Sequence, residues 1–222
     1  MELTKDLAYL LGSLRDGSVL KYSEKSGKTH YYITFYSKDI YWLNFLSKIL
    51  TRIFSEKQSL CIPKKGTPYL RIYSKKIAEM MREKFGHPLT SQITWKTPDI
   101  LLKTNNPEII KWYIAGFWDA EGGFDIRTHQ IRFHLSWNGL ECPPLMDIKQ
   151  FLKKLNIETG EVGIYENKNG NFPRFVLRIS KKDNGKFLQK IPISNPSKIE
   201  KIGIRPQNSS PTEVGGPDNG RD

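Results

Sequence analysis

One order of sequence patterns occurs twice in this chain of 222 residues, and that repeat restricts the fold more than any other feature. Within residues 5–86, a helical pattern is followed by two strand-like runs, a helix, two more strand-like runs and a third helix. The same order begins again at Asn106, a helix cap with Pro107 at the first helical position. The sequence therefore predicts an α+β fold of two αββαββα repeats, each containing an antiparallel sheet.

Short matching segments support the repeat and set its boundaries. "YLLGSLRDG" (9–17) matches "YIAGFWDAEG" (113–122), and "RIYSKK" (71–76) matches "RISKK" (178–182). We therefore expect a first repeat over residues 1–86, a linker over 87–105 and a second repeat over 106–204. Residues 205–222 are rich in Pro, Gly, Asn and Ser and are expected to form a disordered tail.

The charge of the chain indicates a polyanionic partner. The formal net charge is +12 and the isoelectric point is about 9.6, values typical of proteins that bind nucleic acid. The alternative is a basic protein without that role. No apolar run of about 18 residues predicts a membrane helix, and the N-terminus has no signal-peptide pattern, so an intracellular protein is expected. Cys61 and Cys142 are expected to be free thiols.

Alternation along the strands predicts one apolar face under helices and one polar face rich in Arg, Lys, His, Tyr and Thr. Such side chains suit phosphates and base edges in a DNA major groove, whereas an ordinary solvated sheet is the alternative. The absence of Asp and Glu from the four faces compared favours DNA. The residues expected to contact it are Lys21, Lys28, His30, Tyr32, Thr34, Tyr36, Lys64, Lys65, Tyr69, Arg71, Tyr73, Arg127, His129, Arg132, His134, Lys168, Arg174 and Arg178.

Each repeat begins with a helix that carries small residues and ends at an acid. Ala8 and Gly12 in the first helix, and Ala115 and Gly116 in the second, would let the two helices pack closely. That packing would bring Asp16 and Glu121 together, although the helix dipole and mutual repulsion both disfavour carboxylates there. A hard cation such as Mg²⁺ would offset both effects and could support phosphodiester hydrolysis. For either acid alone, a solvated helix end is the alternative reading. Asp119, in the same stretch, is expected to be structural.

These two stretches resemble the paired motifs of LAGLIDADG homing endonucleases, in the single-chain form with two repeats. The resemblance spans about residues 5–195. The second motif matches the family spacing through Ala115, Gly116, Asp119, Ala120, Glu121 and Gly122. In the first motif, four positions rather than five separate Gly12 from Asp16, which places the register of helix packing in question.

The resemblance implies a pseudo-twofold axis, a saddle of strands on DNA, and metal-dependent cutting of both strands of a long asymmetric target. It makes Asp16 and Glu121 the catalytic and metal-binding acids, with Gly17 and Gly122 as further metal ligands. Mg²⁺ is the expected ion, and Mn²⁺ or Ca²⁺ could occupy the same site. Lys38 or Ser37, and Asn138 or Ser136, would lie at its periphery. The chain is expected to be a monomer, and such proteins are usually encoded in introns or inteins.

Two other functions fit the same fold. An RNA maturase would bind intron RNA rather than double-stranded DNA, and a DNA-binding regulator would use an inactive form of the scaffold. Retention of both acids, Asp16 and Glu121, favours cleavage over either. A zinc protein is disfavoured because the histidines do not form ligand spacings with Cys61 or Cys142. The sequence therefore predicts a site-specific double-strand DNA endonuclease that does not act at a membrane.

Overall fold

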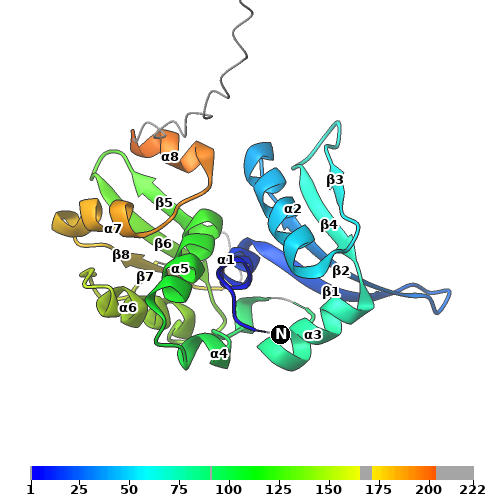
Figure 1. Ribbon diagram of the computed structural model, residues 1–222. Coiled ribbons are helices and arrows are strands. Elements are labelled where there is room, and N and C mark those ends of the chain that lie inside the picture. Colours follow the sequence, from blue (N-terminus) through cyan, green and yellow to red (C-terminus); the bar gives the residue numbers. More distant parts are fainter. Residues whose placement is uncertain (1, 91, 166–171, 204–222) are drawn as a thin grey trace, which may run out of the picture.

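The computed structural model describes residues 2–90, 92–165 and 172–203. Two helices, α1 (Lys5–Ser13) and α5 (Pro107–Glu121), lie side by side at the centre, with one four-stranded antiparallel sheet on either side (Figure 1). The strand orders β1-β2-β4-β3 and β5-β6-β8-β7 are the same in both sheets. The predicted α+β fold of two repeats is therefore confirmed. The expected tail, 205–222, falls outside the described residues.

The remaining elements of the first repeat follow the predicted order. They are a 3₁₀ turn η1 (Leu14–Asp16), β1 (Gly17–Ser23), β2 (Thr29–Tyr36), α2 (Ile40–Phe54), β3 (Ser59–Cys61), β4 (Tyr69–Tyr73) and α3 (Lys75–Phe85). The residues between the repeats form η2 (Gln92–Thr94) and a short helix, α4 (Asp99–Leu102).

The second repeat has the same succession and one added helix. Its elements after α5 are β5 (Gly122–Asp125), β6 (Gln130–Ser136), α6 (Pro143–Lys154), β7 (Gly163–Tyr165), β8 (Arg174–Arg178), η3 (Lys181–Asp183) and α7 (Asn184–Lys190). A further helix, α8 (Pro196–Ile202), which the sequence analysis did not predict, closes the described chain and lies near α2 of the first repeat in Figure 1.

Side-chain caps fix where the main helices begin. Thr4, Asp39 and Ser74 each accept a hydrogen bond from a backbone N–H in the first turn of α1, α2 and α3. Asn106 does the same for α5, directly before the proline at its first position. These caps satisfy donors that the helix itself leaves free. They fix the residues at which α1 and α5 begin.

The helices cover one face of each sheet and share a single hydrophobic core with the linker. Ile33 and Phe35 of β2, and Ile131 and Phe133 of β6, are buried beneath the helices. Trp95 of the linker is also buried in this core. The residues between the repeats therefore pack against both of them, which leaves the opposite face of each sheet available for a ligand. No helix in the described ranges is long and apolar enough to cross a membrane.

Candidate active site

Two glycines let the central helices touch backbone to backbone. A Cβ atom placed on Gly12 would lie 2.3 Å from the carbonyl oxygen of Tyr113 and 2.6 Å from the nitrogen of Phe117. A Cβ atom on Gly116 would lie 2.0 Å from the carbonyl oxygen of Tyr9. Any side chain at either position would therefore separate the helices. Ala8 and Ala115 are fully buried in the same helix pair.

The shorter first motif is accommodated by a change of helix type. From Gly116 to Glu121, five α-helical steps advance the chain by about 7.5 Å. In the first motif the α-helix ends at Ser13 and a 3₁₀ turn covers Leu14–Asp16. One α-helical step and three 3₁₀ steps of about 2.0 Å also total about 7.5 Å. The tighter turn thus places Asp16 at the same level as Glu121, and the missing residue does not shift the crossing of Gly12 on Gly116.

The two acids lie close enough at the ends of these helices for their charges to interact. Asp16 is only partly exposed to solvent and Glu121 is half-buried. Burial by the surrounding protein raises the pKa of Asp16 to about 6. Burial, and then the negative charge of Asp16, raise the pKa of Glu121 to about 8. Within the described ranges, neither carboxylate forms a hydrogen bond or ion pair. Two close carboxylates without donors favour the binding of a cation.

A lysine that the sequence analysis did not consider lies beside them. The Nζ atom of Lys198, in α8, donates hydrogen bonds to the carbonyl oxygens of Trp118 (2.8 Å), Ala120 (3.1 Å) and Gly122 (2.7 Å). It also lies 5.2 Å from the centre of the Trp118 ring. Burial lowers the pKa of Lys198 to about 8, against the opposing effect of the nearby acids. This ammonium group therefore caps the end of α5 and fixes the turn that carries Glu121.

Both repeats hold the segment that carries Lys198. Ser194 N–H donates to the Asp119 carboxylate at 2.8 Å, while the backbone N–H and the hydroxyl of Ser197 both donate to Asp39 Oδ2. Asp39 also caps α2 in the first repeat. We call residues 193–198 the C-terminal strap. The strap joins the two halves across the end of α5.

Asp119 has the structural role that was expected of it. It is 1% exposed and accepts a hydrogen bond of 2.6 Å from Tyr9 Oη as well as the one from Ser194. Trp42 Nε1 in turn donates to Tyr9 Oη at 2.8 Å. Asp119 therefore connects α5 to α1, α2 and the C-terminal strap, and its side chain is not available to a ligand.

The sequence did contain a signal for the strap. Asn195 and Pro196 repeat the Asn-Pro pair that begins α5, and an Asn cap followed by Pro is a helix start. Nothing in the sequence, however, showed that Lys198 would reach back to α5, because that contact joins residues about 80 positions apart.

The donor atoms at the site suit a hard divalent ion. Asp16 and Glu121 supply carboxylate oxygens, while the main chain beside Glu121 supplies carbonyl oxygens. No group of three or more His, Cys, Asp and Glu side chains in the described ranges could hold a metal. Mg²⁺ does not require one, because it is commonly held by one or two carboxylates and completes its shell with water and substrate phosphate.

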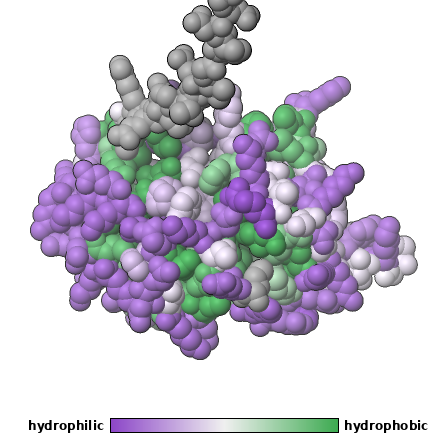
Figure 2. Space-filling model, in the orientation of Figure 1, coloured by the Kyte–Doolittle hydropathy of each residue, from purple (hydrophilic) through white to green (hydrophobic). Residues whose placement is uncertain are grey.

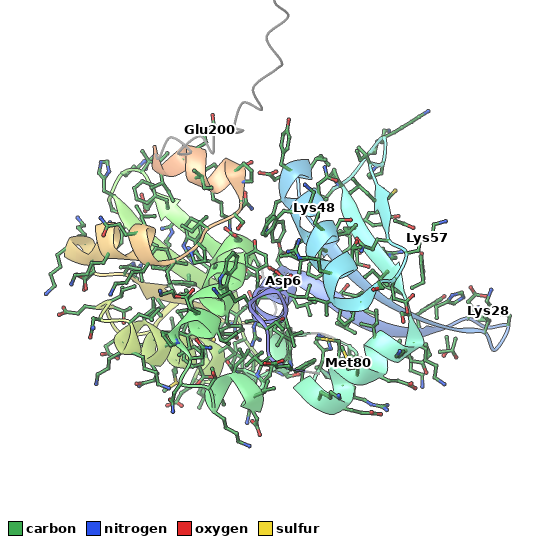
Figure 3. The ribbon with its side chains drawn as sticks, viewed as in Figure 1. Asp6, Lys28, Lys48, Lys57, Met80 and Glu200 are labelled. Carbon is green, nitrogen blue, oxygen red and sulfur yellow. The ribbon has the colours of Figure 1, made fainter. Side chains whose placement is uncertain are left out.

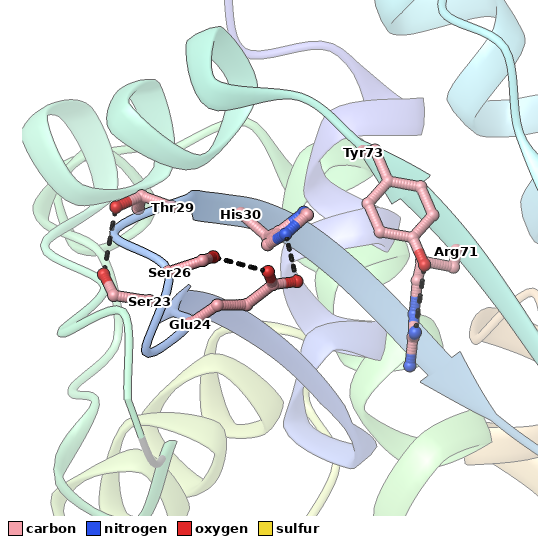
Figure 4. Close-up of polar contacts among 7 residues, drawn as sticks. All are labelled: Ser23, Glu24, Ser26, Thr29, His30, Arg71 and Tyr73. Carbon is pink, nitrogen blue, oxygen red and sulfur yellow. Dashed lines mark hydrogen bonds and ion pairs between the residues drawn. The ribbon is translucent and has the colours of Figure 1, made fainter.

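The polar face of the first sheet is built around Arg71. Its guanidinium lies 4.5 Å from the Tyr32 ring centre and 4.7 Å from that of Tyr69. Its Nε donates to Thr34 Oγ1 at 2.8 Å, and Nη1 contacts Tyr73 Oη at 3.3 Å (Figure 4). Thr34 is fully buried beneath this arginine, so the expectation that it contacts DNA directly is wrong. Thr34 instead orients Arg71.

The polar face of the second sheet is cationic. Arg132 pairs with Arg178 across the strands, and Ser136 pairs with Arg174. Burial, followed by these arginine charges, lowers the pKa of His134 to about 4, so its imidazole is neutral near pH 7. The face also contains an acid, since Asp125 lies 3.0 Å from Arg132. The two sheets therefore present different chemistry: tyrosines around one arginine in the first, and several arginines in the second.

The other residues expected to bind DNA are distributed around these faces. Lys21 is exposed and pairs with Tyr31 across β1 and β2, with its Nζ atom 5.8 Å from the centre of the Tyr31 ring. His30 Nε2 is hydrogen-bonded to Glu24 Oε1 at 2.8 Å in the first hairpin (Figure 4), where Figure 3 also shows Lys28 at the outer end. Tyr36 is exposed beside Tyr69. Four others lie exposed in turns: Lys64, Lys65, Arg127 and His129. Lys168 lies outside the described residues.

Among the described residues, no hydrogen bond or ion pair joins the expected peripheral residues to the acids. Lys38 and Asn138 are exposed, and Gly17 is buried at the start of β1. Gly122 O already accepts a hydrogen bond from Lys198, which leaves one lone pair for a metal.

Cys61 and Cys142 are free, as expected. Hydrophilic side chains cover much of both repeats on the face seen in Figure 2.

Comparisons with known proteins agree with this fold. A family model described as a LAGLIDADG-like domain matches residues 108–192. Homing endonuclease I-ApeI of Aeropyrum pernix is 29% identical over 201 residues, covering 88% of this chain and 85% of that protein. The crystal structure of I-DmoI in complex with DNA and Mn has a TM-score of 0.64 at 23% identity, covering 87% of this chain and 99% of that one. I-WcaI bound to its DNA recognition sequence has a TM-score of 0.58 at 19% identity, covering 91% and 88%.

Proposed function

We propose that this chain is a two-repeat LAGLIDADG protein and a site-specific endonuclease that cuts both strands of a long, asymmetric DNA target. The observation that carries the proposal is the placement of Asp16 and Glu121 close together at the ends of crossing helices, where neither carboxylate forms a hydrogen bond or ion pair with the described residues. The similar protein I-ApeI is named a homing endonuclease, and the similar structures of I-DmoI and I-WcaI contain DNA. One polypeptide supplies both acids, so the chain acts as a monomer.

The acids serve to hold divalent metal, with Mg²⁺ as the proposed ion. The structure of I-DmoI with DNA was determined with Mn, and others of that protein with Mg or Ca. A bound ion would polarise the phosphate and activate water for hydrolysis. Asp16 and Glu121 would hold and orient that ion from one repeat each. Gly12 and Gly116 contribute by letting the helices approach until both carboxylates face the same phosphate region.

The two sheets would hold the DNA and read its sequence. Arg71 is oriented by Thr34 and the tyrosine rings, which leaves its outward N–H groups available for a base edge. Arg174 is exposed on the second sheet and suits a phosphate or a guanine. Because the two faces differ in composition, the halves of the target should differ in sequence. We further propose that the protein is encoded in an intron or intein and acts on genomic DNA inside a cell or organelle.

The proposal is tested by cleavage of a randomised duplex library with Mg²⁺ or EDTA, followed by sequencing of the cut ends. We expect metal-dependent cuts at one long motif, and loss of cutting with retained binding in Asp16→Asn and Glu121→Gln proteins. A fully active Glu121→Gln protein would refute the assigned role of that acid. Binding without any cutting would instead support a DNA-binding regulator, and affinity for RNA but little for duplex DNA would support a maturase.

A further inference from the structure

We infer that Lys198 is a positioning residue for the carboxylate pair, which holds the Glu121 turn in place and weakens the binding of divalent cations by free protein. The inference rests on the proposed function of Asp16 and Glu121 as metal ligands. It goes further, because it assigns a role in that site to a helix outside the two repeated motifs.

The hydrogen bonds of Lys198 determine what it positions. All three protons of the ammonium group can be used at once, by the carbonyl oxygens of Trp118, Ala120 and Gly122. Two of these carbonyls lie on either side of Glu121. The last carbonyls of a helix have no partner within the helix, so the lysine stabilises the junction at which α5 becomes β5. The direction of the Glu121 side chain depends on that junction.

The position of the ammonium group is itself fixed. Ser197, the preceding residue, is bound through two hydrogen bonds to Asp39 of the first repeat. Ser194 is bound to Asp119 of the second repeat. The ammonium group also lies 5.2 Å from the centre of the Trp118 ring. The backbone around Lys198 is therefore held to both halves, and its three hydrogen bonds hold the ammonium group at the end of α5 in the free protein.

That fixed charge must affect any cation that binds the acids. Asp16 and Glu121 are near enough for their charges to act on Lys198, although no ion pair joins them. An incoming divalent ion would be repelled by the ammonium group. The carbonyl oxygens it would meet already accept hydrogen bonds from Lys198. The lysine thus offsets part of the carboxylate charge when metal is absent and opposes metal when it arrives. DNA phosphates, which are negative, would reduce this opposition.

The test is a Mn²⁺ titration of metal-free, DNA-free protein, with free Mn²⁺ measured by electron paramagnetic resonance. We expect Lys198→Met to bind Mn²⁺ about tenfold more tightly than the parent protein. This factor follows from the repulsion between one unit charge and a doubly charged ion about 6 Å away in water. Lys198→Gln removes the charge but keeps a donor for the carbonyls, and should also bind more tightly. Lys198→Arg keeps the charge and should remain close to the parent.

Lys201→Met is the matched control, because it removes the same charge from an exposed position on the same helix. It should change Mn²⁺ affinity far less than Lys198→Met. Circular dichroism and thermal melting would establish that each variant is folded. Unchanged or weaker Mn²⁺ binding by folded Lys198→Met and Lys198→Gln proteins would overturn the inference, since a purely structural lysine would give that result.

The inference and the proposed function can fail separately. If Glu121→Gln abolishes Mn²⁺ binding but both Lys198 variants bind like the parent, the metal site stands and the role of Lys198 is wrong. If the Lys198 variants bind more tightly but no duplex is ever cut, the role of Lys198 stands and the endonuclease assignment is wrong. If no variant binds Mn²⁺, both are wrong.

Discussion

Replacing Glu121 with Gln should make the metal-free protein more stable at alkaline pH while it abolishes cleavage. In the folded protein, burial and then the charge of Asp16 raise the pKa of Glu121 from 4.5 to about 8. A raised pKa means that the folded state prefers the protonated acid. Glutamine imitates that neutral form and has nearly the same shape, so it removes an unfavourable charge without creating a cavity.

The sign and size of the effect follow from linkage. Between pH 4.5 and pH 8 the folded state binds more protons at Glu121 than the unfolded state, so the free energy of unfolding falls as pH rises. The shift of the Glu121 pKa from 4.5 to about 8 corresponds to a change of at most ~5 kcal/mol in the free energy of unfolding. Because Glu121 is only half-buried and water can relax around it, we expect a gain of about 1–3 kcal/mol for Glu121→Gln at pH 9. The gain should disappear below pH 4.5, where both side chains are neutral.

The assay is equilibrium unfolding by denaturant in EDTA at pH 4.5, 7 and 9, repeated with Mg²⁺. Mg²⁺ should stabilise the parent protein and leave Glu121→Gln nearly unchanged, because a ligand stabilises only the state that binds it. Glu108→Gln, at the other end of α5, is the control. Hydrogen bonds from Lys111 and Lys5 lower the pKa of Glu108, so its replacement should cause little change or a small loss. Equal stability of parent and Glu121→Gln proteins at pH 9 would refute the reasoning.

Two further predictions concern the turn after α5 and the face of the first sheet. A Cβ atom on Gly122 would lie 2.3 Å from the Trp118 ring, whereas one on Gly123 would meet nothing within 4 Å. Gly122→Ala should therefore lower the free energy of unfolding by about 1–3 kcal/mol and reduce cleavage, and Gly123→Ala should do neither. Equal unfolding midpoints of the two variants would contradict this. Arg71→Gln should relax specificity at one base pair by about 1–3 kcal/mol in a library-binding assay, whereas a fall of about one in the salt slope of binding would show a phosphate contact instead.

The repeated fold was predictable because its signals are local. Apolar periodicity, the Asn106 cap and the glycines at 12 and 116 each depend on residues that are near one another in the sequence or recur in both halves. The two acids could be identified for the same reason, since each follows a helical stretch of small and apolar residues. Because the pattern occurs in both repeats, it identified the matching positions of the two acids, although one is Asp16 and the other is Glu121.

The parts of the site that could not be predicted depend on contacts between distant segments. Lys198 lies about 80 residues from the carbonyl groups it binds, and Thr34 is buried by Arg71 from a strand that is not its neighbour in sequence. Lys21 was expected among the DNA contacts, but its cross-strand partner is Tyr31, which packs against the hydrophobic core. Alternation within one strand gives two faces but does not say which side chains a third residue will cover.

The asymmetry of this site originates beside the acids rather than in them. Tyr9 and Tyr113 occupy equivalent positions, 104 residues apart, as do Arg15 and Asp119. Tyr9 donates a hydrogen bond to Asp119, whereas Tyr113 accepts one from Arg15. The buried charged partner of the tyrosine is therefore an acid in one case and a base in the other. Each charge then binds a different segment of the chain.

Arg15 donates to the carbonyl oxygen of Trp95 in the linker, and Asp119 accepts from Ser194 of the C-terminal strap. Only the second arrangement brings a lysine to the end of its helix. The buried partner of each tyrosine therefore decides which connecting segment covers that helix end. Lys198 of the strap bonds the carbonyl groups on either side of Glu121 but acts on Asp16 through its charge, so the two carboxylates have unequal surroundings. A chain that carries both repeats can make this distinction, whereas a symmetric dimer of one repeat would carry the same residue at both positions.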